Sequence, residues 1–525
     1  MAVRATGPRP IPRTAEVPSA TTSLAPKPDT FARVRGPRTS EAPRTSVITS
    51  MLHGAQLVLQ SLFPNAPKKP SWFSGFLPQP RELHGVKITK IEGEIPRALN
   101  GTFYRNGPGA FGEVSHVFDA DGMVARFHFD DGAITFSNRF VQTSQRLEEE
   151  AAGARLYRGF GSPLPGGVPG NAIAGIDETA NTSVLPFGDK LLAMAENGRP
   201  YALDPETLET IGEHDFNGTL GPHTFFSAHP KVLADGTAYN FGMAYGPLPA
   251  VNLWRIDPSG SLEKLPRLPL RHNTMMHDFA ATKNHVVVLE HPYRAGIGGI
   301  LKMFAGQDTL ANALAWHGDD PMTVHVMDKS GAVKRFETPP DFIGHTVNAF
   351  EDKDGNVCVD YLGYKDDAPY RMLQSVLDAP PTLAMENTLT RLVISRSGVE
   401  KKKLARMDAE FPQINPRYAG RDYQFLYAVK SETGAWSSSR LVKTDVKSGQ
   451  TSSHDFGAGH FPGEPIFVPK PDAVSEDDGW LLSVVYDATT HGSYVAVLDA
   501  AHLSLLAKAH LPIHLPVGFH GAFRA

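Results

Sequence analysis

Seven short turn motifs recur along this chain, and they restrict its fold more than any other feature does. Each begins with an Asp or Ser, six of the seven contain Gly or Pro, and the flanks alternate apolar and polar residues, as in Val324-His325-Val326-Met327. Alternation of this kind is typical of strands with one buried face, and such turns connect antiparallel neighbours. The intervals run from 50 residues (395 to 445) to 74 (130 to 204). The motifs begin at Asp130, Asp204, Asp257, Asp328, Ser395, Asp445 and Asp499.

One four-stranded sheet fits each interval, so we predict an all-β fold, a seven-bladed β-propeller. Three runs interrupt the rhythm, at 158–175, 291–317 and 364–390, and we expect them to form a cap (dome) of loops and short helices over one face. The 48 glycines and 43 prolines of the 525 residues suit a fold with many tight turns.

The net charge of −5 and the isoelectric point near 6.5 give no polyanion-binding signature, so no nucleic-acid partner is expected. The single cysteine, Cys358, excludes an intrachain disulfide and indicates a reducing compartment. No run approaches the roughly 18 apolar residues that a membrane-spanning helix needs. Peripheral membrane contact remains open.

Residues 1–48 are rich in Pro, Ser, Thr and Arg and carry only three acids, Glu16, Asp29 and Glu41. They indicate a disordered leader or a plastid transit peptide, so the expected location is the plastid, with the cytoplasm or a membrane surface as the alternative. The segment 49–63 has one broad apolar face and predicts a helix. We expect residues 49–525 to form a single propeller domain.

Four histidines stand out from the 21 because each lies in a distinctive local setting. Any single histidine is more often structural than functional, but imidazoles from distant segments can meet where a closed, symmetric fold brings those segments together. Neutral imidazole is the commonest protein ligand of first-row metals. The sequence therefore predicts a metal centre made by four residues: His229 in Ser-Ala-His-Pro, His277 in Met-His-Asp-Phe, His345 after Gly344, and His520 in Phe-His-Gly.

Three glutamates in otherwise apolar stretches are candidates for a carboxylate shell behind those rings. They are Glu196, Glu410 and Glu464. An isolated buried carboxylate is costly, whereas one that accepts the outward ring N–H of a metal-bound histidine has a reason to stay ionised. Asp278 follows His277 directly, so on a strand it is expected to point to the opposite side and to be structural.

Several motifs resemble those of the carotenoid cleavage oxygenase family, and they fall in the family's order over roughly residues 75–525. They include Gly101-Thr102-Phe103-Tyr104-Arg105-Asn106-Gly107-Pro108-Gly109, Phe118-Asp119-Ala120-Asp121-Gly122-Met123, Leu203-Asp204-Pro205-Glu206-Thr207 and Gly463-Glu464-Pro465-Ile466. The motifs are closest to those of cyanobacterial members. The resemblance implies a capped seven-bladed propeller whose four histidines bind Fe(2+). It also implies three supporting pairs, Glu196 with His277, Glu410 with His345 and Glu464 with His520, and no carboxylate for His229.

The activity implied is cleavage of a conjugated C=C bond of a carotenoid or apocarotenoid by dioxygen, giving two carbonyl products such as retinal. The alternatives are a lignostilbene-type dioxygenase, a retinoid isomerase and a non-catalytic carotenoid-binding propeller. A zinc hydrolase is disfavoured because four imidazoles would close a tetrahedral zinc and leave no position for water.

Four positions near the expected metal are candidates for the substrate cavity: Ala195, Met275, Met276 and Gly344. Ala195 and Gly344 look smaller than their counterparts in the cyanobacterial relatives, which predicts a roomier cavity and a product shift in Gly344→Phe. Methionine tolerates varied ligands. The segment 296–304, flanked by the basic Arg294 and including Lys302, is expected to be a buried cap helix or a tunnel mouth that dips into a membrane.

Overall fold

The structure, a computed structural model, describes residues 71–112, 114–377, 385–431 and 438–525. These residues fall in a compact unit, Lys69–Ala525. The leader predicted at 1–48 and the helix predicted at 49–63 lie outside the described residues, so both stay predictions.

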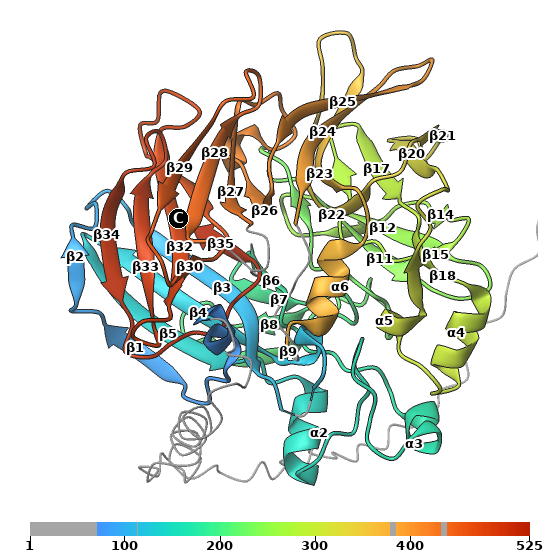
Figure 1. The fold of residues 1–525 in the computed structure, drawn as a ribbon, viewed down its shortest axis with the longest axis horizontal. Coiled ribbons are helices and arrows are strands. Elements are labelled where there is room, and N and C mark those ends of the chain that lie inside the picture. Colours follow the sequence, from blue (N-terminus) through green and yellow to red (C-terminus); the bar gives the residue numbers. More distant parts are fainter. Residues whose placement is uncertain (1–70, 113, 378–384, 432–437) are drawn as a thin grey trace, which may run out of the picture. The chain divides into compact units, whose positions relative to one another are not determined.

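Seven antiparallel sheets form the blades of a propeller (Figure 1). The blades are described in order around the ring, starting with the one that contains β3, and each begins at its strand nearest the axis. The first has β35 (Gly521–Arg524), β3 (Gly101–Ala110), β4 (Asp121–Asp130), β5 (Ala133–Phe140) and β1 (Leu83–Lys87). The second has β6 (Ser183–Phe187), β7 (Lys190–Met194), β8 (Tyr201–Leu203) and β9 (Thr210–Glu213). The third has β10 (Lys231–Val232), β11 (Ala238–Ala244), β12 (Ala250–Ile256), β13 (Leu262–Lys264) and β14 (Leu268–Pro269).

The fourth sheet has β16 (Ala280–Ala281), β17 (His285–Glu290), β20 (Met322–Asp328) and β21 (Val333–Thr338). The fifth has β22 (Phe342–Glu351), β23 (Val357–Tyr364), β24 (Asn387–Ile394) and β25 (Val399–Arg406). The sixth has β26 (Ala409–Gln413), β27 (Phe425–Lys430), β28 (Arg440–Asp445) and β29 (Thr451–Asp455). The seventh has β30 (His460–Pro462), β31 (Ile466–Pro469), β32 (Gly479–Asp487), β33 (Gly492–Asp499), β34 (Leu505–His510) and β2 (Ile91–Gly93). First strands of adjacent blades contact one another, as β16 does β22 and β35 does β6.

All seven predicted turn motifs occupy the same place, between the third and fourth strands of a blade, where β30 and β31, which both pair with β32, count as one strand. The turn between β12 and β13 shows why an aspartate begins such a motif. Asp257 Oδ1 accepts the backbone N–H groups of Ser259 at 2.8 Å and Ser261 at 3.0 Å. Gly260 adopts a φ of +90°, which an L side chain rarely takes. The propeller prediction is confirmed.

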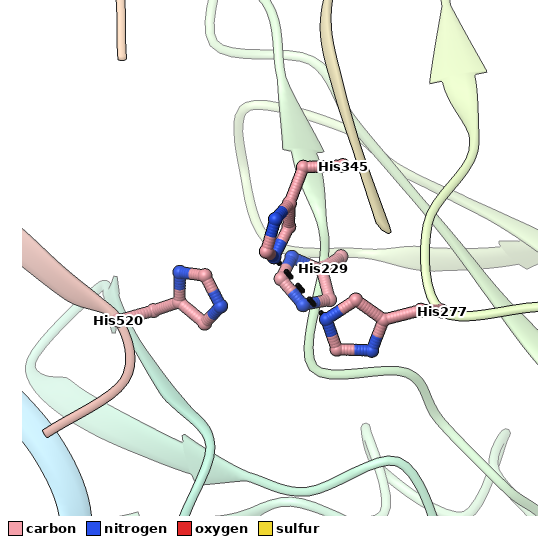
Figure 2. Close-up of side chains that lie close together, drawn as sticks. All are labelled: His229, His277, His345 and His520. Carbon is pink, nitrogen blue, oxygen red and sulfur yellow. Dashed lines mark hydrogen bonds between the residues drawn. The ribbon is translucent and has the colours of Figure 1, made fainter. Parts of the chain in front are cut away.

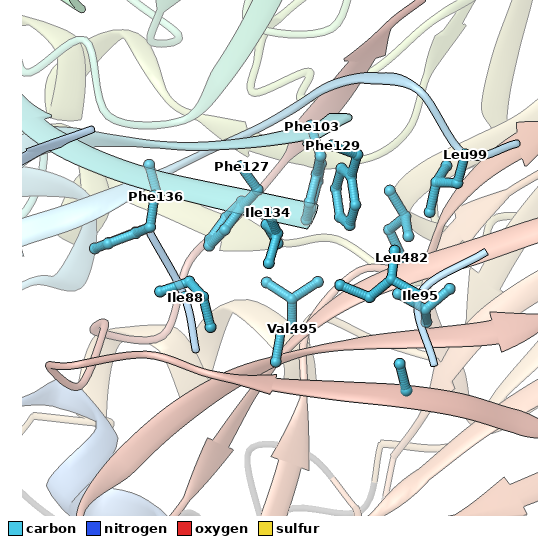
Figure 3. Packing of buried hydrophobic residues seen from close by; sticks show 14 of the residues in the cluster. Ile88, Ile95, Leu99, Phe103, Phe127, Phe129, Ile134, Phe136, Leu482 and Val495 are labelled. Atoms are coloured by element: carbon cyan, nitrogen blue, oxygen red, sulfur yellow. The ribbon is translucent and has the colours of Figure 1, made fainter. Parts of the chain in front are cut away.

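The two ends of the described chain interlock to close the ring of blades. The early strand β2 pairs with β34 in the seventh blade, and the last strand β35 pairs with β3 in the first blade. A buried apolar cluster fills the space between these two blades (Figure 3). In it Phe127 lies between Phe103 and Phe136, with ring centroids 5.4 and 5.3 Å away.

Insertions between strands form the cap. The helices are α2 (Ser144–Ala152), α3 (Val168–Ile173), α4 (Ile297–Phe304), α5 (Leu310–Ala313) and α6 (Ala368–Ser375). Three 3-10 turns also occur, η1 (Ser71–Phe76), η2 (Val117–Asp119) and η3 (Pro416–Tyr418). An eighth, three-stranded sheet has β15 (Asn273–Thr274), β18 (Tyr293–Ala295) and β19 (Leu314–Trp316). The three predicted interruptions hold α3, then α4 and α5, then α6. They are joined by hydrogen bonds from Ala311 N to Phe160 O and from Gln374 Nε2 to Ala311 O, each 3.1 Å.

Within the described ranges, no helix has the length and apolar character needed to cross a membrane.

Candidate metal centre

Each of the seven blades supplies one of the seven predicted centre residues. Four lie in or next to the first strand of a blade as histidines, and three blades contribute a glutamate instead. The histidines are His520 just before β35, His229 before β10, His277 before β16 and His345 within β22; the glutamates are Glu196 just after β7, Glu410 within β26, and Glu464 between β30 and β31. Since first strands surround the axis, side chains from every blade can reach one point.

The four histidine rings meet there. One ring nitrogen from each lies within 4.8 Å of the corresponding atom of the other three. His277 Nε2 and His345 Nε2 lie 3.2 Å apart (Figure 2). His520 approaches from the segment before β35, on the other side of the group from His277 (Figure 2). An irregularity in the pairing of β22 with β23 falls between Ile343 and Thr346, which locally re-aims the strand at His345.

The three glutamates lie beside the histidines expected for them. Glu410 Oε2 is 2.6 Å from His345 Nδ1, and Glu464 Oε1 is 2.9 Å from His520 Nδ1. Glu196 Oε1 is 3.1 Å from His277 Nδ1, although the ring N–H is not directed at it, so this pair forms a contact without a hydrogen bond. The same oxygen is 3.8 Å from His229 Nε2. The Nδ1 atoms of three rings therefore face outward, and their Nε2 atoms are free to face the centre.

The electrostatics of the centre favour neutral imidazoles at His520 and His229 and ionised carboxylates at Glu410 and Glu464, whereas His345 is favoured as a cation beside Glu410. Burial lowers the pKa of His520 to about 4 and lowers that of His229 well below its ordinary value. Burial also opposes protonation of His345, but the adjacent Glu410 outweighs it and raises the pKa. Burial alone would raise the pKa of Glu464, and the neighbouring His520 and Arg105 lower it below its usual range.

This donor set fits a divalent metal ion. Metal–nitrogen bonds of roughly 2.1 Å at right angles place two donors about 3.0 Å apart, close to the 3.2 Å between His277 Nε2 and His345 Nε2. His229 Nε2 is buried and, among the described residues, has no hydrogen-bond partner. A buried orphaned donor atom is costly unless an unseen group satisfies it. Four imidazoles suit iron, zinc, copper or cobalt.

Further residues hold the carboxylates, and the sequence reasoning assigned them no role. Arg105 Nη1 donates to Glu464 Oε2 at 3.0 Å, and Gln413 Nε2 donates to Glu464 Oε1 at 2.8 Å. Tyr364 Oη donates to Glu410 Oε1 at 2.6 Å. The sequence did contain a reason to assign Arg105 a role, because a cation within the strand Gly101–Ala110, which is almost entirely buried, needs a buried carboxylate partner.

Phe411 has the strained positive φ of +57°. Its ring centroid lies 5.8 Å from that of His345 and 5.3 Å from that of His520. Strain of this kind persists where surrounding contacts over-determine a site.

A cavity of about 350 Å³ opens from the centre towards the cap. His277 and Glu196 lie in its wall, and Ala195, Met275 and Met276 line it as the sequence predicted. About half of the remaining lining residues are aromatic or aliphatic, among them Phe118, Phe160, Phe241, Met303 and Phe304, and by exposed area the wall is mostly apolar. The volume lies within the usual range for a small-molecule site, about 300–1,000 Å³.

Gly344 is not among the lining residues. A Cβ atom at this position would lie 2.9 Å from Glu410 Oε1 and 4.0 Å from the Tyr364 ring. The glycine therefore makes room for the carboxylate behind His345 rather than for substrate. The expectation that Gly344 widens the cavity is not supported, because a phenylalanine there would displace Glu410 instead of filling the cavity.

A propeller that gathers four histidines on its axis, with a carboxylate behind three of them and an apolar cavity alongside, defines a class of metal-dependent oxidoreductases. Residues 76–525 match a protein-family model described as retinal pigment epithelial membrane protein. The chain thus belongs to this family, the carotenoid cleavage oxygenases, and is an enzyme.

Two relatives and one solved structure show how close the similarity is. The apocarotenoid-15,15′-oxygenase of Synechocystis is 33% identical over 479 residues, covering 86% of this chain and 96% of the relative. Resveratrol cleavage oxygenase 1 of Aspergillus fumigatus is 30% identical over 497 residues, covering 89% and 97%. The crystal structure of the cobalt-substituted Synechocystis enzyme superposes with a TM-score of 0.78 at 31% identity, covering 86% of this chain and 98% of that one.

Proposed function

We propose that this enzyme is an Fe(2+)-dependent dioxygenase that cleaves one conjugated C=C bond of an apocarotenoid or carotenoid. The products are two carbonyl compounds, with retinal among them where a suitable apocarotenal is cleaved centrally. The observation that carries the proposal is the four-histidine centre beside a largely apolar cavity, whose wall contains one of the four, His277, together with Met275 and Met276. An apolar wall excludes water and accepts a polyene.

The side chains of this protein hold the metal ion and orient the substrate beside it. His229, His277, His345 and His520 would hold the iron, and the three glutamates would fix the rings by their Nδ1 atoms. When bound, the iron would supply a site at which dioxygen reacts with the double bond. Both oxygen atoms enter the products and the C=C bond supplies all four electrons, so no reductant is needed. The cavity wall aligns the polyene so that one double bond lies beside His277.

A stilbene is the second candidate substrate, because the Aspergillus relative is named for resveratrol. A phenolic substrate needs polar groups at the end of the cavity remote from the metal. Arg158 and Asp177 line the cavity within the insertions of the cap, and burial raises the pKa of Asp177 to about 8. The largely apolar wall favours the polyene.

The test is aerobic turnover of an apocarotenal and, separately, of resveratrol by iron-loaded protein, with products identified by chromatography and mass. His277→Ala should bind less iron and lose at least 100-fold in rate, while His285→Ala, which changes a histidine outside the centre, should retain activity. Paired carbonyl products from the apocarotenal support the proposal. Cleavage of resveratrol alone would replace the substrate, and absence of bound metal in the wild-type protein would overturn the proposal.

We further propose that the cap binds a membrane surface, from which the apolar substrate enters the cavity. Helices α3 and α4 expose an unusual amount of apolar side chain: Ile173 is 89% exposed, Leu301 60%, Ile297 53% and Phe304 52%. Phe304 also lines the cavity, so the exposed patch adjoins its wall. Exposed apolar groups in one region mark a contact surface. A plastid location is supported by the composition of residues 1–48 and by a relative in Arabidopsis thaliana that is named as chloroplastic.

A further inference from the structure

Asp278, which directly follows His277, is contacted by residues that follow two of the other histidines. Lys231 comes two positions after His229, Asp278 directly follows His277, and Thr346 directly follows His345. The three segments belong to the third, fourth and fifth blades, three consecutive blades of the propeller. None of these three residues is among those that line the cavity, and none is one of the four histidines of the centre.

The contacts are short and specific. Lys231 Nζ lies 2.6 Å from Asp278 Oδ1 and 2.8 Å from Oδ2. Thr346 donates to Oδ2 from both its backbone N and its Oγ1, each at 2.8 Å. Phe279 N donates to Oδ1 at 2.8 Å. The carboxylate therefore accepts from all three blades' segments at once.

Burial makes this arrangement more than a surface ion pair. The side chain of Asp278 is 1% exposed and that of Lys231 is 24% exposed. Charges in such a site interact more strongly than in water, and removal of one partner leaves the other unsatisfied. Movement of any one of the three segments would break contacts to a buried carboxylate, so the three must move together.

The local strand geometry provides the amide that the carboxylate uses. The pairing of β22 with β23 is irregular on both sides of Thr346, between Ile343 and Thr346 and again between Thr346 and Asn348. The same irregular stretch directs the His345 ring to the centre and the Thr346 N–H to Asp278. His520, from the first blade, is held separately through Glu464 and Arg105.

We propose that Asp278 is a positioning residue that fixes the separations of His229, His277 and His345, so that three of the four nitrogen donors stand in place before a metal binds. The inference rests on the proposed metal centre but not on the identity of the substrate. It extends the role of the glutamates, which orient individual rings, because Asp278 instead sets the distances between the ring-bearing segments.

The experiment measures cobalt(II) affinity by chelator competition, together with the visible spectrum of the cobalt protein. Asp278→Asn should weaken cobalt binding by about 10–100-fold and shift the ligand-field bands. Thr346→Val, which removes the hydroxyl near Asp278 Oδ2 and Phe279 O (each 2.8 Å from Oγ1) but keeps the backbone N–H contact, should have a smaller effect in the same direction. The matched control is Asp360→Asn, because Asp360 is a buried carboxylate held by Arg391 and Tyr423 away from the centre.

The outcomes distinguish the positioning role of Asp278 from the existence of the metal centre. If Asp278→Asn and Asp360→Asn lose similar thermal stability but only the former loses affinity and changes spectrum, the positioning role holds. Unchanged affinity and bands in a folded Asp278→Asn would overturn it. Should Asp278→Asn fail to fold, Thr346→Val with wild-type affinity and spectrum would overturn it as well. Failure of the wild-type protein to bind cobalt would instead reject the metal centre itself.

Discussion

At the scale of single residues, charged groups are buried where this chain provides partners for them. Arg105 within an apolar strand is satisfied by Glu464, and Asp278 by Lys231 and Thr346. At Asp177 the attraction of Arg155 is too weak to offset burial. Burial raises its pKa from 3.8 to about 8, and the nearby Glu149 and Asp121 add to the effect.

The raised pKa predicts that Asp177 reduces stability as pH rises. Below pH 3.8 the carboxyl is protonated in both states; between 3.8 and about 8 only the unfolded state ionises, so stability is lost across that interval. Asp177→Asn should therefore increase the free energy of unfolding at pH 8 by on the order of 1 kcal/mol, with little change near pH 4. Urea melts at both pH values check this. An equal effect at both would show that packing, and not ionisation, is responsible.

The candidate site also shows which residues of a metal centre can be predicted from their local sequence. The seven centre residues came from local settings and family motifs, and the structure brings all seven together. The direction of Gly344 could not be read in the same way, because the irregular stretch of β22 decides which side of the strand faces Glu410. The partners of Asp278 were equally hidden, since they lie 47 and 68 residues away.

At the scale of elements, α4 divides into two faces. Ile300 and Met303 are buried, while Ile297, Leu301 and Phe304 are at least half exposed. The segment 296–304 was expected to be either a buried cap helix or a membrane-dipping tunnel mouth, and its two faces suit both roles.

The exposed face leads to a binding prediction. Ile297→Ser combined with Leu301→Ser should lower the fraction of protein that cosediments with phospholipid vesicles about tenfold, because two apolar side chains can no longer be buried in the lipid. The control is Val474→Ser, which changes a side chain that is 94% exposed and lies between β31 and β32, outside the cap. Equal vesicle binding by all three proteins would reject the membrane surface.

At the scale of the whole molecule, closure of the ring depends on the first and seventh blades. Strands from both ends of the described chain meet there, and the apolar cluster between them holds Phe127, which is fully buried. In a closed ring of blades, loss of packing between the first and seventh blades cannot be relieved by moving a free edge.

Phe127→Ala should therefore cost about 3–5 kcal/mol of the free energy of unfolding, because it removes a ring packed between two others and leaves a cavity. Phe304→Ala, at an exposed position, should change the same quantity by less than about 0.5 kcal/mol. Chemical denaturation of both variants measures the difference. A cost below about 1 kcal/mol for Phe127→Ala would show that the packing between these blades relaxes and contributes little to closure.

The sequence alone determined the all-β class, the seven blades and the turn in each, because turn chemistry and strand alternation depend on neighbours close in the chain; its local motifs predicted the residues of the centre. Only the tertiary structure decided that Gly344 faces Glu410, that Arg105 holds Glu464 and that Asp278 joins three blades. These features depend on strand irregularities and on contacts across tens to hundreds of residues. Such contacts exist only after the ring of blades has closed around its axis.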